Sequence, residues 1–149
     1  MKCKIKSIFA YCMTTRFQVM TDIHVSSGND FTRKAMPVVS SWILHHIHTL
    51  SEDQLLAVVY CYTKMDYVDK DFVSSLRKYV KVRCLQIEDA NLVAAICEYC
   101  IDTRVRSAEI LNGVSEFFTA RCSDLTTPQL HSIARVFGEL DFHPSNGFM

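Results

Sequence analysis

The chain has 149 residues, of which 49% are hydrophobic and 21% charged, and its sixteen Lys and Arg residues are balanced by sixteen Asp and Glu. This length and composition are typical of one folded domain and exclude a largely disordered chain. Gly and Pro are scarce, at 4 and 3 residues, and the apolar pattern is helical almost throughout. The sequence therefore predicts an all-α protein.

The apolar runs and the cysteines bear on two further classes, membrane-spanning proteins and disulfide-rich proteins. No run approaches the roughly 20 apolar residues that a membrane-spanning helix requires, so no membrane span is expected. Four of the seven cysteines, Cys61, Cys97, Cys100 and Cys122, fall within or at the ends of predicted helices. We interpret them as small core residues in a reducing compartment rather than as a disulfide framework.

The first segment in chain order, residues 1–32, is basic and contains no acidic residue before Asp22. Lys2, Lys4 and Lys6 alternate with apolar residues, a composition that suits a mitochondrial targeting segment and predicts a location in the mitochondrial matrix. The same cations fit a docking arm that lies on a polyanion or on a partner protein. The sequence leaves both interpretations open.

A loop is expected from Thr21 to Phe31, and a helical array over residues 33–149. Its first helix is predicted at about 37–48, opened by Pro37, with Trp42 on its apolar side.

Three later stretches share one helical spacing of apolar residues. They begin at Leu55, Leu92 and Leu130, which lie 37 and 38 residues apart. Such a period is typical of stacked helical hairpins that each lack a core of their own. The predicted fold is thus an α-solenoid of helix-turn-helix repeats with a 37–38 residue period.

The repeats are predicted as two hairpins, at about 51–83 and 88–121, followed by a final first helix at about 127–141. Ser51, with Gln54 three residues later, is a helix-start signal of the capping-box type.

The ends of the first helices differ among the copies. The middle copy has Asp102-Thr103 where the others have Met65-Asp66 and Leu140-Asp141. We therefore expect its turn to be less regular.

The residues from Leu50 to Tyr67, and again from Leu125 to Pro144, resemble the repeats of octotricopeptide and heptatricopeptide repeat proteins and the helical repeats of FAST kinase-like and RAP-domain proteins. The resemblance covers Pro37 to Pro144 and implies an organellar protein with a role in RNA processing, stability, translation or ribosomal assembly. HEAT and tetratricopeptide repeats have similar periods and also fit the spacing.

Cations concentrate in the second helix of the first hairpin and in nearby turns, where they would neutralise RNA phosphates. The candidate RNA contacts are Lys70, Arg77, Lys78, Lys81, Arg83, Arg104, Arg106 and Arg121, together with Lys2, Lys4 and Lys6 of the first segment. A basic last turn also suits the dipole of its own helix. Acidic residues on neighbouring turns predict weak autonomous RNA affinity.

Two groups resemble fragments of metal sites. Cys97 and Cys100 form one Cys-x-x-Cys pair, and His45, His46 and His48 form a short cluster. Neither group has enough partners for four ligands, so no metal and no cofactor are expected. We interpret both as packing residues, with stacking of a histidine on an RNA base as the alternative.

No nucleophile elbow, Walker loop, zinc-protease motif or kinase signature occurs in the chain, so neither an enzyme nor a small-molecule substrate is expected. The last copy supplies a first helix without a second, which is expected to leave one face for a partner. The candidate partner-binding residues are Ile133, Phe137, Leu140, Phe142 and Trp42.

These features predict a non-catalytic accessory subunit of a mitochondrial ribonucleoprotein, with the mitoribosome as the leading candidate, that contacts rRNA and neighbouring proteins. The alternative is a protein-binding scaffold subunit of another mitochondrial complex, without RNA contact.

Overall fold

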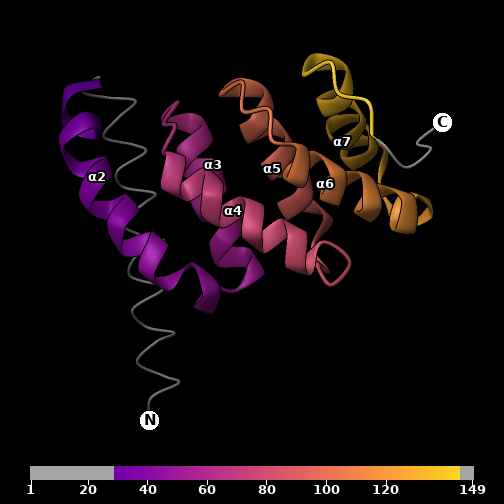
Figure 1. Cartoon of the computed structure of the whole chain (residues 1–149), viewed down its shortest axis with the longest axis horizontal. Coiled ribbons are helices and arrows are strands. Elements are labelled where there is room, and N and C mark those ends of the chain that lie inside the picture. The colour runs from indigo at the N-terminus through magenta and orange to yellow at the C-terminus, as the bar shows by residue number, and fades with distance from the viewer. Residues whose placement is uncertain (1–28, 145–149) are drawn as a thin grey trace, which may run out of the picture.

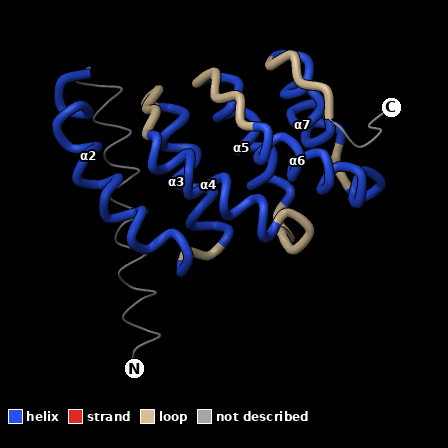
Figure 2. Tube along the Cα trace, in the orientation of Figure 1, coloured by secondary structure: helices blue, strands red, loops and turns tan. Residues whose placement is uncertain are grey.

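The computed structural model describes residues 29–144, and over this range the chain forms helices and turns without any strand (Figure 1, Figure 2). The α-helices are α2 (Asn29–His46), α3 (Glu52–Lys64), α4 (Lys70–Arg83), α5 (Ala90–Asp102), α6 (Ala108–Arg121) and α7 (Thr127–Glu139). Two short 3-10 helices, η1 (Ile47–Thr49) and η2 (Cys122–Asp124), follow α2 and α6. The predicted all-α class is confirmed for the described residues. None of their helices is long and apolar enough to cross a membrane.

The helices pack in two layers. Helices α3, α5 and α7 lie side by side in chain order, and α4 packs against α2 and against α6. We call α3, α5 and α7 the A layer and α2, α4 and α6 the B layer. Figure 1 shows α2, the α3–α4 pair, the α5–α6 pair and α7 following one another along the long axis of the molecule. Within each layer, the helices therefore follow one another in chain order, every second helix belonging to the same layer.

Side-chain caps define where the helices begin. Ser51 and Gln54 form a reciprocal capping box at α3, with the Gln54 N–H donating to Ser51 Oγ (3.3 Å) and the Ser51 N–H donating to Gln54 Oε1 (3.0 Å). At α7 the Thr126 N–H donates in the same way to Gln129 Oε1 (3.0 Å). Such contacts satisfy N–H groups that the first helical turn leaves without partners.

The turns that close the A-layer helices share one hydrogen-bond pattern. In each turn a residue with positive φ is followed by a residue whose N–H donates to the carbonyl five residues earlier, which is the Schellman arrangement. The positive-φ residues are Asp66 (46°), Arg104 (55°) and Asp141 (47°). The donor and acceptor pairs are Tyr67 to Tyr62 (3.1 Å), Val105 to Cys100 (2.9 Å) and Phe142 to Phe137 (2.9 Å).

The turn after α5 is thus as regular as the other two, and the expectation of a less regular turn there is wrong. The positive-φ residues of the three turns are 38 and 37 residues apart. Thr103, rather than Asp102, therefore corresponds to Met65 and Leu140. The apolar spacing alone placed the middle copy one residue out of register, because both Leu92 and Val93 are buried.

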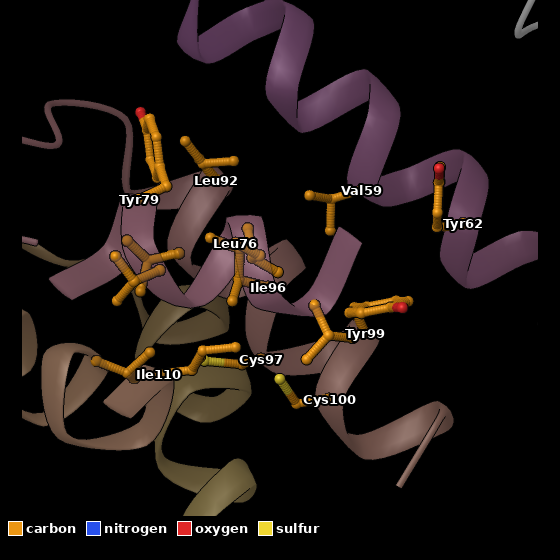
Figure 3. Packing of buried hydrophobic residues seen from close by; sticks show 14 of the residues in the cluster. Val59, Tyr62, Leu76, Tyr79, Leu92, Ile96, Cys97, Tyr99, Cys100 and Ile110 are labelled. Carbon is orange, nitrogen blue, oxygen red and sulfur yellow. The ribbon is translucent and has the colours of Figure 1, made fainter. Parts of the chain in front are cut away.

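A continuous apolar core fills the space between the layers, with contributions from α3, α4, α5 and α6 (Figure 3). The ring of Tyr62 stacks on that of Phe72 with 4.0 Å between centroids, and the ring of Tyr99 meets Phe72 edge-on at 5.8 Å. Burial raises the pKa of the Tyr62 and Tyr99 hydroxyls. The three aromatic residues join two A-layer helices to α4.

Helix α2 begins at Asn29, eight residues before its predicted start at Pro37. The loop predicted from Thr21 to Phe31 therefore overlaps the beginning of this helix. Pro37 lies inside the helix on an exposed position, where its missing N–H removes one backbone hydrogen bond without interrupting the helix. Proline was misread as a helix start because it is common there.

A buried hydrogen-bond chain fixes α2 to its neighbours. The Tyr62 hydroxyl of α3 donates to Ser40 Oγ (2.8 Å), and the Ser40 hydroxyl donates to the carboxylate of Asp69. Asp69 is also the N-cap of α4, accepting from the N–H groups of Asp71 and Phe72. Three helices thus meet at one polar contact.

Helices α4 and α6 approach closely at Gly113. A Cβ atom at this position would lie 2.5 Å from Val80 Cγ1, a distance that no methyl group tolerates without a shift of its neighbours. Glycine is therefore required for the B-layer packing at this crossing.

Candidate nucleic-acid interface

The exposed cations of α4 are the first part of the candidate interface. Asp69 caps the N-terminus of the helix, and Lys81 and Arg83 occupy its last turn, where cations stabilise the helix dipole. Lys70, Lys78, Lys81 and Arg83 are exposed, and none of them forms an ion pair with another described residue. Their charges are available to a polyanion.

Arg77, the fifth cation of α4, is partly neutralised. Its Nε lies 3.5 Å from Glu109 Oε2 at the start of α6. The pKa of Glu109 is lowered by a backbone hydrogen bond, by the Ser107 hydroxyl, and by Arg77 and Lys81. The two residues therefore form an ion pair between α4 and α6.

Arg83 and Arg121 occupy equivalent places at the ends of α4 and α6. The Arg83 guanidinium lies over the Tyr79 ring, 5.6 Å from its centroid, and the Arg121 guanidinium lies over the Phe117 ring at 5.7 Å. Each arginine ends its helix, and the aromatic residue lies one turn earlier. The two cations therefore occur at the same position of two successive helical pairs.

Arg104 and Arg106 lie at the other end of α6, in the turn that follows α5. Arg106 Nη2 donates to the Asp141 carbonyl (2.6 Å), which ties this turn to the turn after α7. Arg104 is exposed and is the positive-φ residue of its turn. Because α6 has 14 residues, about 21 Å separates this turn from Arg121. The predicted contacts thus form separate groups and not one patch, while Lys2, Lys4 and Lys6 lie outside the described residues.

The predicted partner-binding residues are less accessible than expected. Ile133 and Phe137 of α7 and Leu140, its C-cap, are buried, and α7 packs mainly against α5. Phe142 is half-buried, and its ring centroid lies 6.5 Å from that of Phe137. These side chains pack within the described chain and do not form an open apolar face. The outward side of α7 instead carries small and polar residues, among them His131, Ala134 and Gly138.

Trp42 contacts one of the two histidines of α2. The rings of Trp42 and His46 are stacked with 4.2 Å between centroids. The Nδ1 atoms of His45 and His46 lie 2.8 and 2.9 Å from the carbonyls of Ser41 and Trp42, one turn earlier. The stacked Trp42 ring is half-buried, which limits what it can offer a partner.

Cys97 and Cys100 are both buried in α5 (Figure 3). Burial raises the pKa of both thiols, to about 12 for Cys100, so both remain protonated at neutral pH. Among residues 29–144 no three His, Cys, Asp or Glu side chains form a group that could hold a metal ion.

Two exposed aliphatic residues were not predicted as candidate contacts from the sequence. Val82 and Leu85 lie at the end of α4, outside the buried series Val73, Leu76 and Val80. The exposure of Val82 could have been predicted, because Val82 is two residues beyond the buried Val80 and cannot share its helix face.

Over residues 29–144, these observations define an all-helical fold of sequential, paired helices with exposed lysines that form no ion pair on its B layer. The chain is similar to FAST kinase domain-containing protein 3, mitochondrial, of Bos taurus, with 28% identity over 116 residues that cover 76% of this chain. The proteins of the same name from Homo sapiens and Mus musculus are 25% and 23% identical over similar lengths. No family model and no solved structure matches the chain.

These distant homologues are consistent with the FAST kinase-like family that the sequence resembles. They are named as mitochondrial proteins, which supports the predicted mitochondrial localisation. The aligned region spans 17% of the length of each relative.

Proposed function

We propose that this chain is an RNA-contacting α-solenoid of mitochondria and acts as a non-catalytic subunit of a ribonucleoprotein. The solenoid reading is supported by the two layers and by three equivalent turns at steps of 38 and 37 residues. The RNA-related role is supported by the similarity to mitochondrial FAST kinase domain-containing protein 3 and by the resemblance of the repeats to those of organellar RNA-associated proteins.

The observation that carries the proposal is the equivalence of Arg83 and Arg121. A repeated structure that presents one cation per repeat at the same position can follow a polymer whose charges also repeat. Each guanidinium is held over an aromatic ring, which limits its freedom before RNA binds.

The non-catalytic role is supported by the state of the buried nucleophiles. Burial raises the pKa of Cys84, Cys97 and Cys100, so these thiols are protonated and unreactive at neutral pH. The buried hydroxyl of Tyr62 has a raised pKa for the same reason and is occupied in the contact with Ser40.

The test compares two double variants of the 149-residue chain. Arg83→Ala with Arg121→Ala removes the proposed phosphate contacts. Lys64→Ala with Arg135→Ala removes two cations of the A layer and is the matched control. The affinity for fluorescein-labelled single-stranded RNA is measured by anisotropy over a range of salt concentrations. The first variant should bind more weakly, with a salt slope smaller by about 0.7 for each lost phosphate contact. Equal slopes for the two variants would overturn the proposal.

The particle is identified by sedimentation of mitochondrial lysate with and without ribonuclease. We expect the chain to shift from a large ribonucleoprotein, with the mitoribosome as the leading candidate, to lighter fractions after ribonuclease treatment. Co-sedimentation with protein partners that survives the treatment would favour the alternative role as a scaffold subunit without RNA contact.

A further inference from the structure

The outward side of the end of α4 combines cations with exposed aliphatic side chains. Lys78, Lys81 and Val82 stand at positions i, i+3 and i+4 of α4, and Leu85 follows in the turn after the helix; we call these four residues the α4 outer stripe. Val82 is 73% exposed and Leu85 58% exposed, although both are large aliphatic residues. The loop that contains Leu85 lies at one edge of the molecule (Figure 2).

The charges of the stripe are not neutralised from within the described chain. Neither Lys78 nor Lys81 forms an ion pair there, although Lys81 acts electrostatically on Glu109. Two carboxylates of α6 lie near the end of α4: Glu109, on which Lys81 acts, and Glu116, which accepts from the Cys84 thiol (3.3 Å). A larger acidic group lines an open hollow at the starts of the A-layer helices α3 and α5. Its members are Glu52, Asp53, Glu88 and Asp89.

We propose that the α4 outer stripe binds the surface of a bilayer that contains anionic phospholipids. In this arrangement Val82 and Leu85 enter the boundary between headgroups and acyl chains, while Lys78 and Lys81 contact lipid phosphates. The combination matters, because neither a few lysines nor two aliphatic side chains alone give stable membrane binding.

Two other occupants fit the stripe less well. RNA would use the lysines, but it gains nothing from Val82 and Leu85, since aliphatic side chains offer no ring on which a base can stack. A stable protein interface buries about 800 Å² on each partner and is centred on aromatic or arginine anchors in pockets. The stripe consists of four side chains and contains no aromatic residue.

The main experiment places a reporter at each end of α4 in the 149-residue chain. Leu85→Trp marks the stripe, and Val68→Trp marks the turn before α4, where Val68 is 50% exposed. Tryptophan emission is recorded with phosphatidylcholine vesicles, with and without cardiolipin, and with brominated acyl chains as quenchers. Trp42 and the N-terminal lysines are common to both variants, so they do not account for a difference between them.

With cardiolipin vesicles, the Leu85→Trp emission should shift to shorter wavelength and be quenched by the brominated chains, while the Val68→Trp emission should not change. The inference is overturned if Leu85→Trp shows no shift, if both variants shift equally, or if the shift is the same without cardiolipin.

A second comparison separates this inference from the proposed RNA contact. Val82→Ser with Leu85→Ser should lower vesicle binding at least about tenfold, from the loss of buried CH₂ groups, and leave RNA affinity unchanged. Val38→Ser with Val68→Ser removes two exposed valines elsewhere and should change neither. If the stripe variant binds vesicles as the control does, membrane binding is excluded while the RNA proposal stands. If it loses RNA affinity instead, the stripe belongs to the RNA interface.

Discussion

The two layers of the molecule differ in the contacts that hold their helices together. The A-layer helices make the more extensive contacts with one another, and polar side chains also link them: Glu52 Oε2 accepts from the Asp89 N–H (2.7 Å), and Gln129 Nε2 donates to Asn91 Oδ1 (2.9 Å). In the B layer, α4 and α6 approach closely at Gly113 and are linked by the Arg77–Glu109 ion pair and by the Cys84 thiol, which donates to Glu116 (3.3 Å). Ser40 of α2 donates to Asp69, the N-cap of α4. Lys70, Lys78 and Lys81 of this layer form no ion pair with another described residue.

This difference shows which layer can bind other molecules. Side chains that are already paired must lose their contacts before they bind anything else, whereas unpaired cations carry no such cost. We therefore expect substitutions in the A layer to act mainly on stability, and substitutions of exposed B-layer residues to act mainly on binding.

At neutral pH, the substitution with the largest expected effect is Ile96→Ala in α5. This side chain is fully buried at the centre of the A layer, so its truncation should lower the free energy of unfolding by about 3 kcal/mol. Val82→Ala, on the exposed side of the B layer, should change it by less than about 0.5 kcal/mol. Urea unfolding followed by circular dichroism measures both, and equal losses would contradict the division between the layers.

Gly113→Ala should be the next most damaging change. The added methyl group would meet Val80, and we expect a loss of about 1–3 kcal/mol. Gly138→Ala is the matched control, because nothing lies within 4 Å of its Cβ position. Alanine is the better helix former by about 1 kcal/mol, so the control should be neutral or stabilised in the same unfolding experiment. A stabilised Gly113→Ala would mean that the helices separate at no cost.

The core thiols predict how stability depends on alkaline pH. Burial raises the pKa of Cys100 from 9.0 to about 12, so the unfolded chain loses this proton first. The contribution of this thiol to the free energy of unfolding is therefore fully present below pH 9.0. Between pH 9.0 and about pH 12 it decreases by about 1.4 kcal/mol per pH unit. Urea midpoints measured across this range should fall less steeply for Cys100→Ala than for the native chain. Parallel curves would show that the thiol ionises equally in both states.

Tyr62→Phe should have the smallest effect on global stability and a local effect on α2. It removes the hydroxyl that donates to Ser40, at a cost of about 1 kcal/mol. Hydrogen exchange should show faster exchange in α2, with α7 unchanged. Tyr99→Phe, which removes a bond to the Tyr67 carbonyl, is the comparison and should leave α2 protected.

The helical spacing of apolar residues in the sequence predicted much of the fold. The spacing around Leu55 and Leu130 predicted helices in the A layer. The outer ends of the α3–α4 and α5–α6 pairs and both ends of α7 lie within two residues of the bounds expected from capping residues and apolar stripes, whereas no bounds were predicted for the inner ends of the pairs. The register of the middle copy and the start of α2 were wrong. Leu92 and Val93 are both apolar, and Pro37 fits either a helix start or a tolerated interior position.

The candidate site was less predictable than the fold. Sequence spacing places Arg83 and Arg121 at the ends of their helices, but it does not show that each lies over a ring. The pairing of Arg77 with Glu109 and the contact between Gly113 and Val80 depend on how α4 and α6 cross. Such distances between helices are tertiary properties that no local pattern encodes.

The ordering of neighbours has a consequence for how the molecule reaches its structure. Each helix packs against helices that are close to it in chain order, so few contacts wait for distant parts of the polypeptide. A chain that becomes available gradually from one end can therefore acquire structure pair by pair, with each completed pair serving as a template for the next. Folding from one end of the chain to the other suits a protein that enters its compartment as an unfolded polypeptide.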